Sequence, residues 1–410
     1  MKKKGFNTTN LHSDRQDSPE HGVLHKPVHT SVAYGYEDAR HIAEVFQGKR
    51  EGYNYGRQLN PTVTALQKRI SKMENSLASV AFSTGMGAIS STLLSLLRSG
   101  DHIVSSSFLF GNTNSLFNTL QRLGIEVSFV DATDVCNVED ATKENTKLIF
   151  VETIANPVTQ VADLQKIGQL CKLKGLVYMV DNTMTSPHLF QPRNVNASLI
   201  VNSLTKYIGG HGNALGGIIT DSGLYDWSTF TNILETYRSE DPKFWGITQI
   251  KKKGLRDLGA TLGPEAAHHL AVGSETLQLR MDKASANALA LAKFCDKHPR
   301  VKNTYYPGLS KHPEHGRASQ LFKAYGAIFS IDLIDSLNCF DVLNRMECVI
   351  SSSNLGDTRT LGIPVAHTIY FEMGAKRRNS MGISDSMIRF SVGIEETEDL
   401  IADFEQSLSQ

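Results

Sequence analysis

The chain has 410 residues, 40% of them hydrophobic and 20% charged, the proportions of a globular protein long enough for two or three domains. Its 42 basic and 42 acidic residues cancel, so no bulk charge favours nucleic acid or an anionic membrane as a partner. Because no run reaches the roughly 18 apolar residues that a helical span needs, we expect no membrane segment.

The basic start, Met1–Lys4, is not followed by an apolar segment, so we do not interpret it as a secretory signal. Five cysteines, an odd number without a CxxC pair, are typical of reduced, mostly buried thiols and favour a cytoplasmic location. The 14 histidines show no HExxH or paired ligand spacing, so no metal site is expected.

Residues 1–60 lack a sustained period but are rich in aromatic residues, which disordered tails are not. We interpret them as an N-terminal arm that wraps a neighbouring subunit or closes over a site. From Asn60 to about Thr220 strands alternate with helices, which predicts a mostly parallel sheet covered on both faces. The expected strands are 80–82, 102–106, 125–130, 148–151, 176–180 and 199–201.

After about Asp221 the pattern changes to a helical region opened by Pro264, a long helix over 276–297, and fewer strands. Strands are expected at 327–333 and 388–392, with helices at 340–346 and from Thr397. The sequence therefore predicts an α/β protein with three parts: an arm (1–60), a large domain (61–255) and a smaller α+β domain (256–410).

A lysine stands directly after the last strand of the large domain, in Ser198–Gly210. The apolar run 199–201 predicts a buried strand, and the end of such a strand is where α/β proteins bind ligands. Ser203 and Thr205 place two hydroxyls beside Lys206, as a phosphate requires. Lysine amines form Schiff bases, and pyridoxal phosphate carries both an aldehyde and a phosphate. The alternative is a surface lysine.

The stretch Ser83–Ala88 joins an expected strand to a helix start. The N–H groups of Gly85 and Met86 there have no partner in the helix, and a helix N-terminus favours a phosphate. Any strand-to-helix turn can look like this, so the stretch is informative only together with the others.

Asp181 ends another expected strand, where a carboxylate can keep a pyridine nitrogen protonated. A helix cap is the alternative for Asp181. Tyr55 and Arg57 precede Asn60, and the guanidinium fork of Arg57 suits a phosphate, although a surface arginine has the same appearance. Together with Lys206 these residues describe a pyridoxal phosphate site.

The sequence resembles the cystathionine γ-synthase family of pyridoxal-phosphate enzymes, also called the Cys/Met metabolism family, along nearly its whole length. The resemblance is carried by six motifs: Tyr55-Gly56-Arg57 with Asn60-Pro61-Thr62, Ser83-Thr84-Gly85-Met86-Gly87-Ala88, Glu152-Thr153-Ile154-Ala155-Asn156-Pro157, Val180-Asp181-Asn182-Thr183, Asn202-Ser203-Leu204-Thr205-Lys206-Tyr207 and Arg389-Phe390-Ser391-Val392-Gly393-Ile394-Glu395.

The resemblance implies the aspartate-aminotransferase-type fold (fold type I), pyridoxal 5'-phosphate as cofactor, and a homotetramer built as a dimer of dimers. It implies that Lys206 is the Schiff-base lysine and proton shuttle, that Asp181 holds the pyridine nitrogen and that Asn156 lies near the ring hydroxyl. It implies that Arg389 binds the substrate carboxylate. It implies phosphate contacts from Gly85, Met86, Ser203 and Thr205, with Tyr55 and Arg57 reaching in from the partner subunit.

Two departures from the family pattern concern catalysis and substrate choice. Phe110 replaces the tyrosine that stacks on the cofactor ring; it can still stack but has no hydroxyl to pass a proton. Asn354 replaces a serine of the substrate segment and is expected to contact the substrate, and 364–367 do not match the usual run rich in histidine and serine.

The resemblance implies a small sulfur amino acid as substrate, and γ-chemistry moves one more proton than β-elimination. Because Phe110 removes an acid–base group, we favour β-elimination of L-cystathionine to homocysteine, pyruvate and ammonia. Tyr55 can supply a phenol and Lys206 more than one proton, so γ-replacement or γ-elimination (γ-synthase, γ-lyase or homoserine-ester sulfhydrylase) is the alternative. An aminotransferase on the same fold, or a binding protein with little catalysis, is more distant.

Overall fold

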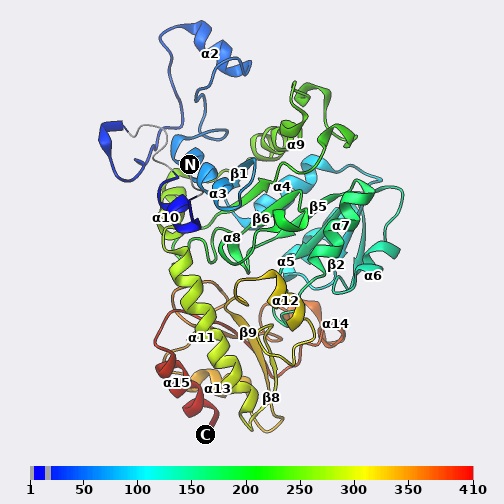
Figure 1. Cartoon of the computed structure of the whole chain (residues 1–410), viewed down its shortest axis with the longest axis vertical. Helices are drawn as coiled ribbons and strands as arrows, with labels where there is room; N and C mark the ends of the chain where they lie inside the picture. The colour runs from blue at the N-terminus through cyan, green and yellow to red at the C-terminus, as the bar shows by residue number, and fades with distance from the viewer. Residues whose placement is uncertain (1–3, 14–19, 410) are drawn as a thin grey trace.

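The computed structural model describes residues 4–13 and 20–409 and builds two β-sheets along one chain (Figure 1). The sheets have seven and five strands, and helix α11 (Leu277–Lys297) runs from the larger body along the smaller one. Within the described residues no helix combines the length and apolar character needed to cross a bilayer.

The large sheet has the strand order β1-β7-β6-β5-β4-β2-β3. Its strands are β1 (Ala78–Phe82), β2 (His102–Ser106), β3 (Glu126–Val130), β4 (Thr146–Glu152), β5 (Val177–Asp181), β6 (Leu199–Asn202) and β7 (Gly217–Asp221). The five from β3 to β6 are parallel, so the predicted mostly parallel sheet is confirmed.

Strand β7 was not predicted, and it runs antiparallel to both of its neighbours, β1 and β6. Its first residue is a glycine, which weakens the sequence signal of a strand. Close packing explains why this residue is a glycine, because a Cβ at Gly217 would overlap the carbonyl oxygen of Thr84.

Both faces of the large sheet are buried, as a parallel sheet requires. Alternate residues of β5 enter different apolar clusters: Tyr178 and Val180 pack on one face, Val177 and Met179 on the other. The covering helices are α3 (Pro61–Met73), α4 (Gly85–Leu96), α5 (Gly111–Arg122), α6 (Val135–Asp140), α7 (Leu164–Lys174) and α8 (Ser186–Leu189).

Local signals explain where these helices begin and end. Asn60 caps α3 by accepting from the N–H groups of Thr62 and Val63, with Pro61 at the first helical position. Gly175 ends α7 with a left-handed φ of 66°, a conformation that glycine adopts without strain.

Between the two sheets the chain forms α9 (Trp245–Gln249), a π-helical segment η6 (Ile250–Asp257) and α10 (Pro264–Ser274). The predicted boundary at 255/256 falls inside η6 and stays a prediction.

The small sheet has the order β10-β11-β12-β9-β8. Its strands are β8 (Val301–Tyr305), β9 (Ile328–Leu333), β10 (Ile350–Ser351), β11 (Leu361–Pro364) and β12 (Met387–Ser391), with helices α12 (His315–Leu321), α13 (Cys339–Arg345), α14 (Ala375–Ser380) and α15 (Thr397–Ser409). The central strands β9 and β12 were predicted because they are apolar. The edge strand β8, with Lys302 and Asn303 exposed, was not.

The arm is less irregular than predicted. It contains α1 (Phe6–Leu11), a short η1 (Glu20–Gly22) and α2 (Ala39–Phe46), which begins where Asp38 caps the N–H of Arg40. Helix α2 projects from the body and has no buried residue (Figure 1). Its apolar Phe46 is 65% exposed, whereas Ile42 and Val45 on the same helix are half-buried.

Candidate functional site

A cavity of about 520 Å³ lies at the carboxyl ends of β4, β5 and β6, where parallel α/β sheets bind ligands. Strand β12 and the loop after β10 supply its other wall. It brings together ten of the twelve predicted site residues: Gly85, Met86, Phe110, Asn156, Asp181, Ser203, Thr205, Lys206, Asn354 and Arg389.

Lys206 lies in the turn after β6, and its Nζ donates to Oδ1 of Asn354 at 2.7 Å. Burial, together with the positive charge of Arg389, lowers the pKa of Lys206 to about 8. The amine is therefore partly unprotonated near neutral pH, as a nucleophile must be.

Asp181 is held in place by its neighbour Thr183. Oδ1 of Asp181 accepts from the N–H and the hydroxyl of Thr183, at 3.0 and 2.6 Å. The same hydroxyl accepts from the N–H of Ser203 at 2.8 Å. Thr183 thus joins the ends of β5 and β6, a role that its motif did not reveal, and leaves Oδ2 of Asp181 without a donor from the described residues.

A second carboxyl, Glu152, ends β4 opposite Asp181 and also lines the cavity. Its Oε1 accepts from the N–H of Phe110 at 2.7 Å. Burial and the charge of Asp181 raise the pKa of Glu152 well above its usual range. Glu152 was quoted in a motif but given no role; the signal that could have found it is a carboxylate at a strand end beside Asp181.

An anion cradle forms where α4 begins. Thr84 caps the helix by accepting from the N–H of Gly87 at 2.9 Å. The N–H groups of Gly85 and Met86 have no acceptor among the described residues and face the cavity with Ser203. A Cβ at Gly85 would come within 3.0 Å of the Ser203 Cβ, so glycine keeps this cradle open.

Asn156 lines the cavity with its side-chain oxygen and nitrogen both buried and without a hydrogen-bond partner. A buried amide left without partners costs free energy, which a bound polar group recovers. Pyridoxal phosphate offers what the cavity lacks: a phosphate for the cradle, a ring hydroxyl for Asn156, a ring nitrogen for Asp181 and an aldehyde for Lys206. The residues present fit that cofactor.

Arg389, from β12, is 1% exposed and reaches the cavity from the other sheet. One guanidinium nitrogen donates to the carbonyl oxygen of Asn354 at 2.8 Å, while Nε is buried without a partner. An arginine with a spare donor at a cavity wall suits a carboxylate.

Two predicted residues, Tyr55 and Arg57, do not line the cavity of their own chain. Tyr55 pairs with Ala33 in the arm, and Arg57 lies over the Tyr55 ring and donates to the carbonyl oxygen of Arg256. Their approach from a partner subunit stays a prediction.

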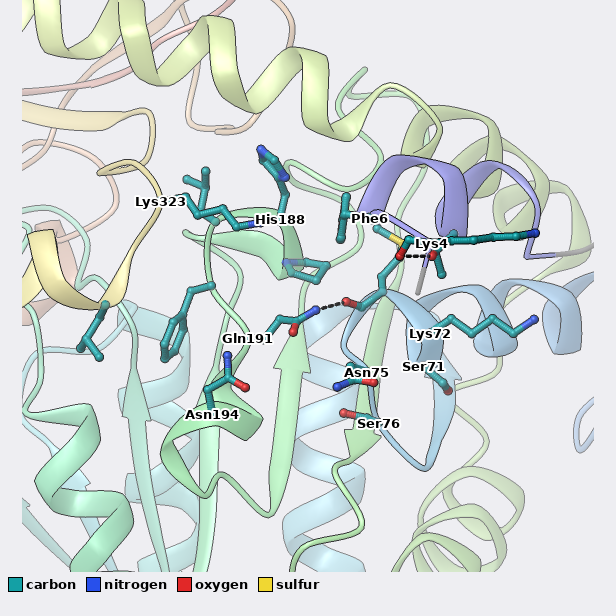
Figure 2. A pocket seen from close by; sticks show the side chains of 16 residues that line it. Lys4, Phe6, Ser71, Lys72, Asn75, Ser76, His188, Gln191, Asn194 and Lys323 are labelled. Carbon is teal, nitrogen blue, oxygen red and sulfur yellow. Dashed lines mark hydrogen bonds between the residues drawn. The ribbon is translucent and has the colours of Figure 1, made fainter. Parts of the chain in front are cut away.

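A second cavity, of about 500 Å³, is lined by residues of α1, the end of α3, α8 and the segment that includes Lys323 (Figure 2). None of the predicted site residues lines it. Figure 2 shows Gln191 donating to the backbone carbonyl of Met73, a bond of 2.6 Å that ties α3 to the segment after β5.

The sequence of residues 7–409 matches the family described as Cys/Met metabolism PLP-dependent enzyme. The chain is 36% identical to an L-methionine gamma-lyase of Fusobacterium nucleatum subsp. polymorphum, covering 100% of this chain and 99% of that one. It is 35% identical to a homocysteine synthase of Schizosaccharomyces pombe, covering 98% of each.

In structure it is similar to a putative O-acetylhomoserine (thiol)-lyase from Campylobacter jejuni, with a TM-score of 0.93 and 30% identity over 99% of this chain and 100% of that one. That crystal structure carries a pyridoxyl-lysine phosphate. The match confirms the expected fold type I.

These relatives are γ-enzymes, so they support the alternative reaction rather than the β-elimination that we favoured. The missing hydroxyl of Phe110 therefore did not decide between the two reactions, and a further carboxyl that we find beside it, Glu152, accepts from its N–H. On the family match and the cavity together, the chain belongs to the Cys/Met metabolism family, and it is a pyridoxal 5'-phosphate-dependent enzyme of carbon–sulfur chemistry on sulfur amino acids.

Proposed function

We propose that this enzyme acts at the γ carbon of its substrate, replacing or eliminating a γ substituent of a homoserine-ester or thioether amino acid. The observation that carries the proposal is the shared cavity of Lys206, Asp181 and Arg389, in a chain whose relatives are γ-enzymes. When bound, the cofactor supplies an electron-accepting ring and an aldehyde carbon.

In this proposal the cradle of Gly85 and Met86 binds the phosphate together with Ser203 and Thr205. Asp181 keeps a proton on the ring nitrogen, and Thr183 holds that carboxylate in place through two hydrogen bonds. Glu152 fixes the backbone of Phe110, whose ring packs against the cofactor and helps to exclude water.

Arg389 binds the substrate carboxylate and so orients the Cα–H bond toward Lys206. Lys206 would hold the cofactor covalently and, once displaced by the substrate amine, would remove the Cα proton and then a proton from Cβ, so that the substituent on Cγ can leave. Asn354, which we predicted as a substrate contact, accepts from the Lys206 amine and keeps it at the cavity wall. Glu152, with its raised pKa, keeps a carboxyl proton in the cavity despite the missing phenol hydroxyl.

We further propose a homotetramer, a dimer of dimers, in which Tyr55 and Arg57 complete the partner's phosphate site and Tyr55 supplies a catalytic phenol. The exposed Phe46 of α2, a helix without a buried residue, supports an arm that packs on another copy. A cytoplasmic location is supported by five cysteines without a disulfide.

The test is a product analysis of the purified enzyme with L-methionine, with L-cystathionine, and with O-acetyl-L-homoserine plus sulfide. 2-Oxobutyrate from L-methionine or L-cystathionine, or homocysteine from O-acetyl-L-homoserine and sulfide, supports γ-chemistry. Pyruvate as the main product from cystathionine would restore β-elimination, and turnover only with a keto-acid acceptor would indicate an aminotransferase. A Lys206→Ala control must lose both the cofactor absorbance and the products.

A further inference from the structure

A carboxyl group lies buried beneath the cofactor cavity without lining it. Glu74 directly follows α3 as its C-terminal cap residue, and it is fully buried. Its Oε1 accepts from Nδ2 of Asn182 at 3.1 Å and from Nδ2 of Asn202 at 2.8 Å. Asn182 follows Asp181, and Asn202 precedes Ser203, so one carboxyl joins the two strand ends that carry the site.

Two acceptors in this cluster have no donor. Oε2 of Glu74 and Oδ1 of Asn202 are both buried and without a hydrogen-bond partner. A buried acceptor left unpaired is costly, and an ionised carboxylate oxygen is more costly still. A proton on Oε2 would turn one of these two acceptors into a donor for the other.

A carboxylic acid and a primary amide commonly pair through two hydrogen bonds, N–H···O and O–H···O. The first is present between Asn202 Nδ2 and Glu74 Oε1, and the atoms of the second are the two unpaired acceptors. This second bond needs a proton on Oε2, so the pairing requires a neutral Glu74.

Among residues 4–13 and 20–409, no basic side chain is bonded to Glu74, whose partners are Asn182 and Asn202. The charged groups on the neighbouring elements are bonded elsewhere: Arg69 to the carbonyl oxygen of Ala271, Lys72 to that of Ser13, His188 to Asp282, and Asp181 to Thr183. Burial raises the pKa of Glu74 to about 7, against the lowering effect of the two asparagine amides.

We propose that Glu74 is a positioning residue, held as a neutral acid paired with Asn202, that fixes the spacing of the strand ends bearing Asp181 and Ser203. The proposal rests on the cofactor roles given above to Asp181 and Ser203, and not on the choice between γ- and β-chemistry. Gln191, bonded to the carbonyl oxygen of Met73, also holds this end of α3 (Figure 2).

The test compares Glu74→Gln with Glu74→Ala in the purified full-length protein, by cofactor Kd and by infrared difference spectra. Glutamine keeps the acceptor for both asparagines and offers an N–H to Asn202 Oδ1, so its cofactor Kd should stay within about 3-fold of the parent. Alanine leaves both amides unpaired, and its Kd should rise at least about 10-fold. The un-ionised carboxyl band at pH 6 should be smaller in Glu74→Gln than in the parent.

Asp221→Asn is the matched control, because Asp221 is another buried carboxyl with a pKa raised to about 7, bonded to Trp227 instead of to the site. It should leave the cofactor Kd unchanged. If Glu74→Gln binds cofactor as weakly as Glu74→Ala, or if no un-ionised carboxyl signal is lost, Glu74 is a carboxylate and the proposal is wrong. Neither readout depends on which products the enzyme forms, and the infrared signal remains decisive if Glu74→Ala does not fold.

Discussion

The lowered pKa of Lys206 predicts unusual reactivity of this amine in the cofactor-free protein. With a pKa of about 8, roughly one amine in ten is unprotonated at pH 7. A lysine at the reference pKa of about 10.4 has roughly one in 2,500, so folding raises the reactive fraction about 250-fold. Because burial is the larger cause and Arg389 the smaller, most of this gain should persist in Arg389→Leu, with the labelling midpoint shifted upward.

The assay is pulse labelling of the apoprotein with a small amine-specific acylating reagent between pH 6 and 11, with Lys206 quantified by mass spectrometry. The same residue in the urea-unfolded chain is the control, since it has identical neighbours in sequence and no cavity. Arg389→Lys keeps a positive charge, so its labelling midpoint should lie nearer to that of the parent than the midpoint of Arg389→Leu does. A midpoint for folded Lys206 that coincides with the unfolded chain would refute the reasoning, because the cavity would then not desolvate the amine.

Three further substitutions test the packing behind the cavity and two of its lining residues. Gly217→Ala drives a methyl into the carbonyl of Thr84, so we expect a loss of about 1–3 kcal/mol of stability by urea unfolding and reduced cofactor content; unchanged values would contradict the close packing. Thr183→Val removes a hydroxyl bond to the Asp181 carboxylate, and a charge-assisted bond of about 1.5–3 kcal/mol predicts a cofactor Kd raised at least about 10-fold, measured by absorbance titration. Phe110→Tyr restores a phenol and should raise the ratio of 2-oxobutyrate to pyruvate from cystathionine; a constant ratio would mean that the hydroxyl is not used.

The elements that the sequence predicted are those whose signal is local. The strand 102–106 is predicted and observed over the same residues. Strand β7 escaped prediction because its place between β1 and β6 depends on pairing with residues far away in sequence. The edge strand β8 is polar, and only its pairing with β9 makes it a strand.

The site residues also differ in whether their sequence signal is local. Lys206, Asp181 and the cradle at Gly85 were predictable because each follows a buried strand, and strand ends of one parallel sheet meet at one edge. The bond from Lys206 to Asn354 joins residues 148 positions apart and could not be read from spacing. The neutral state proposed for Glu74 rests on two buried acceptors without a donor, which no sequence motif reveals.

The two walls of the cavity belong to different sheets, with Asp181 and Lys206 on the larger one and Asn354 and Arg389 on the smaller. Under the roles proposed above, residues of the larger sheet bind the cofactor and residues of the smaller sheet bind the substrate. Changes in 350–370 can therefore retune substrate preference while the cofactor stays seated. A cofactor site and a substrate wall on separate sheets let the preferred amino acid change without rebuilding the bonds that hold the cofactor.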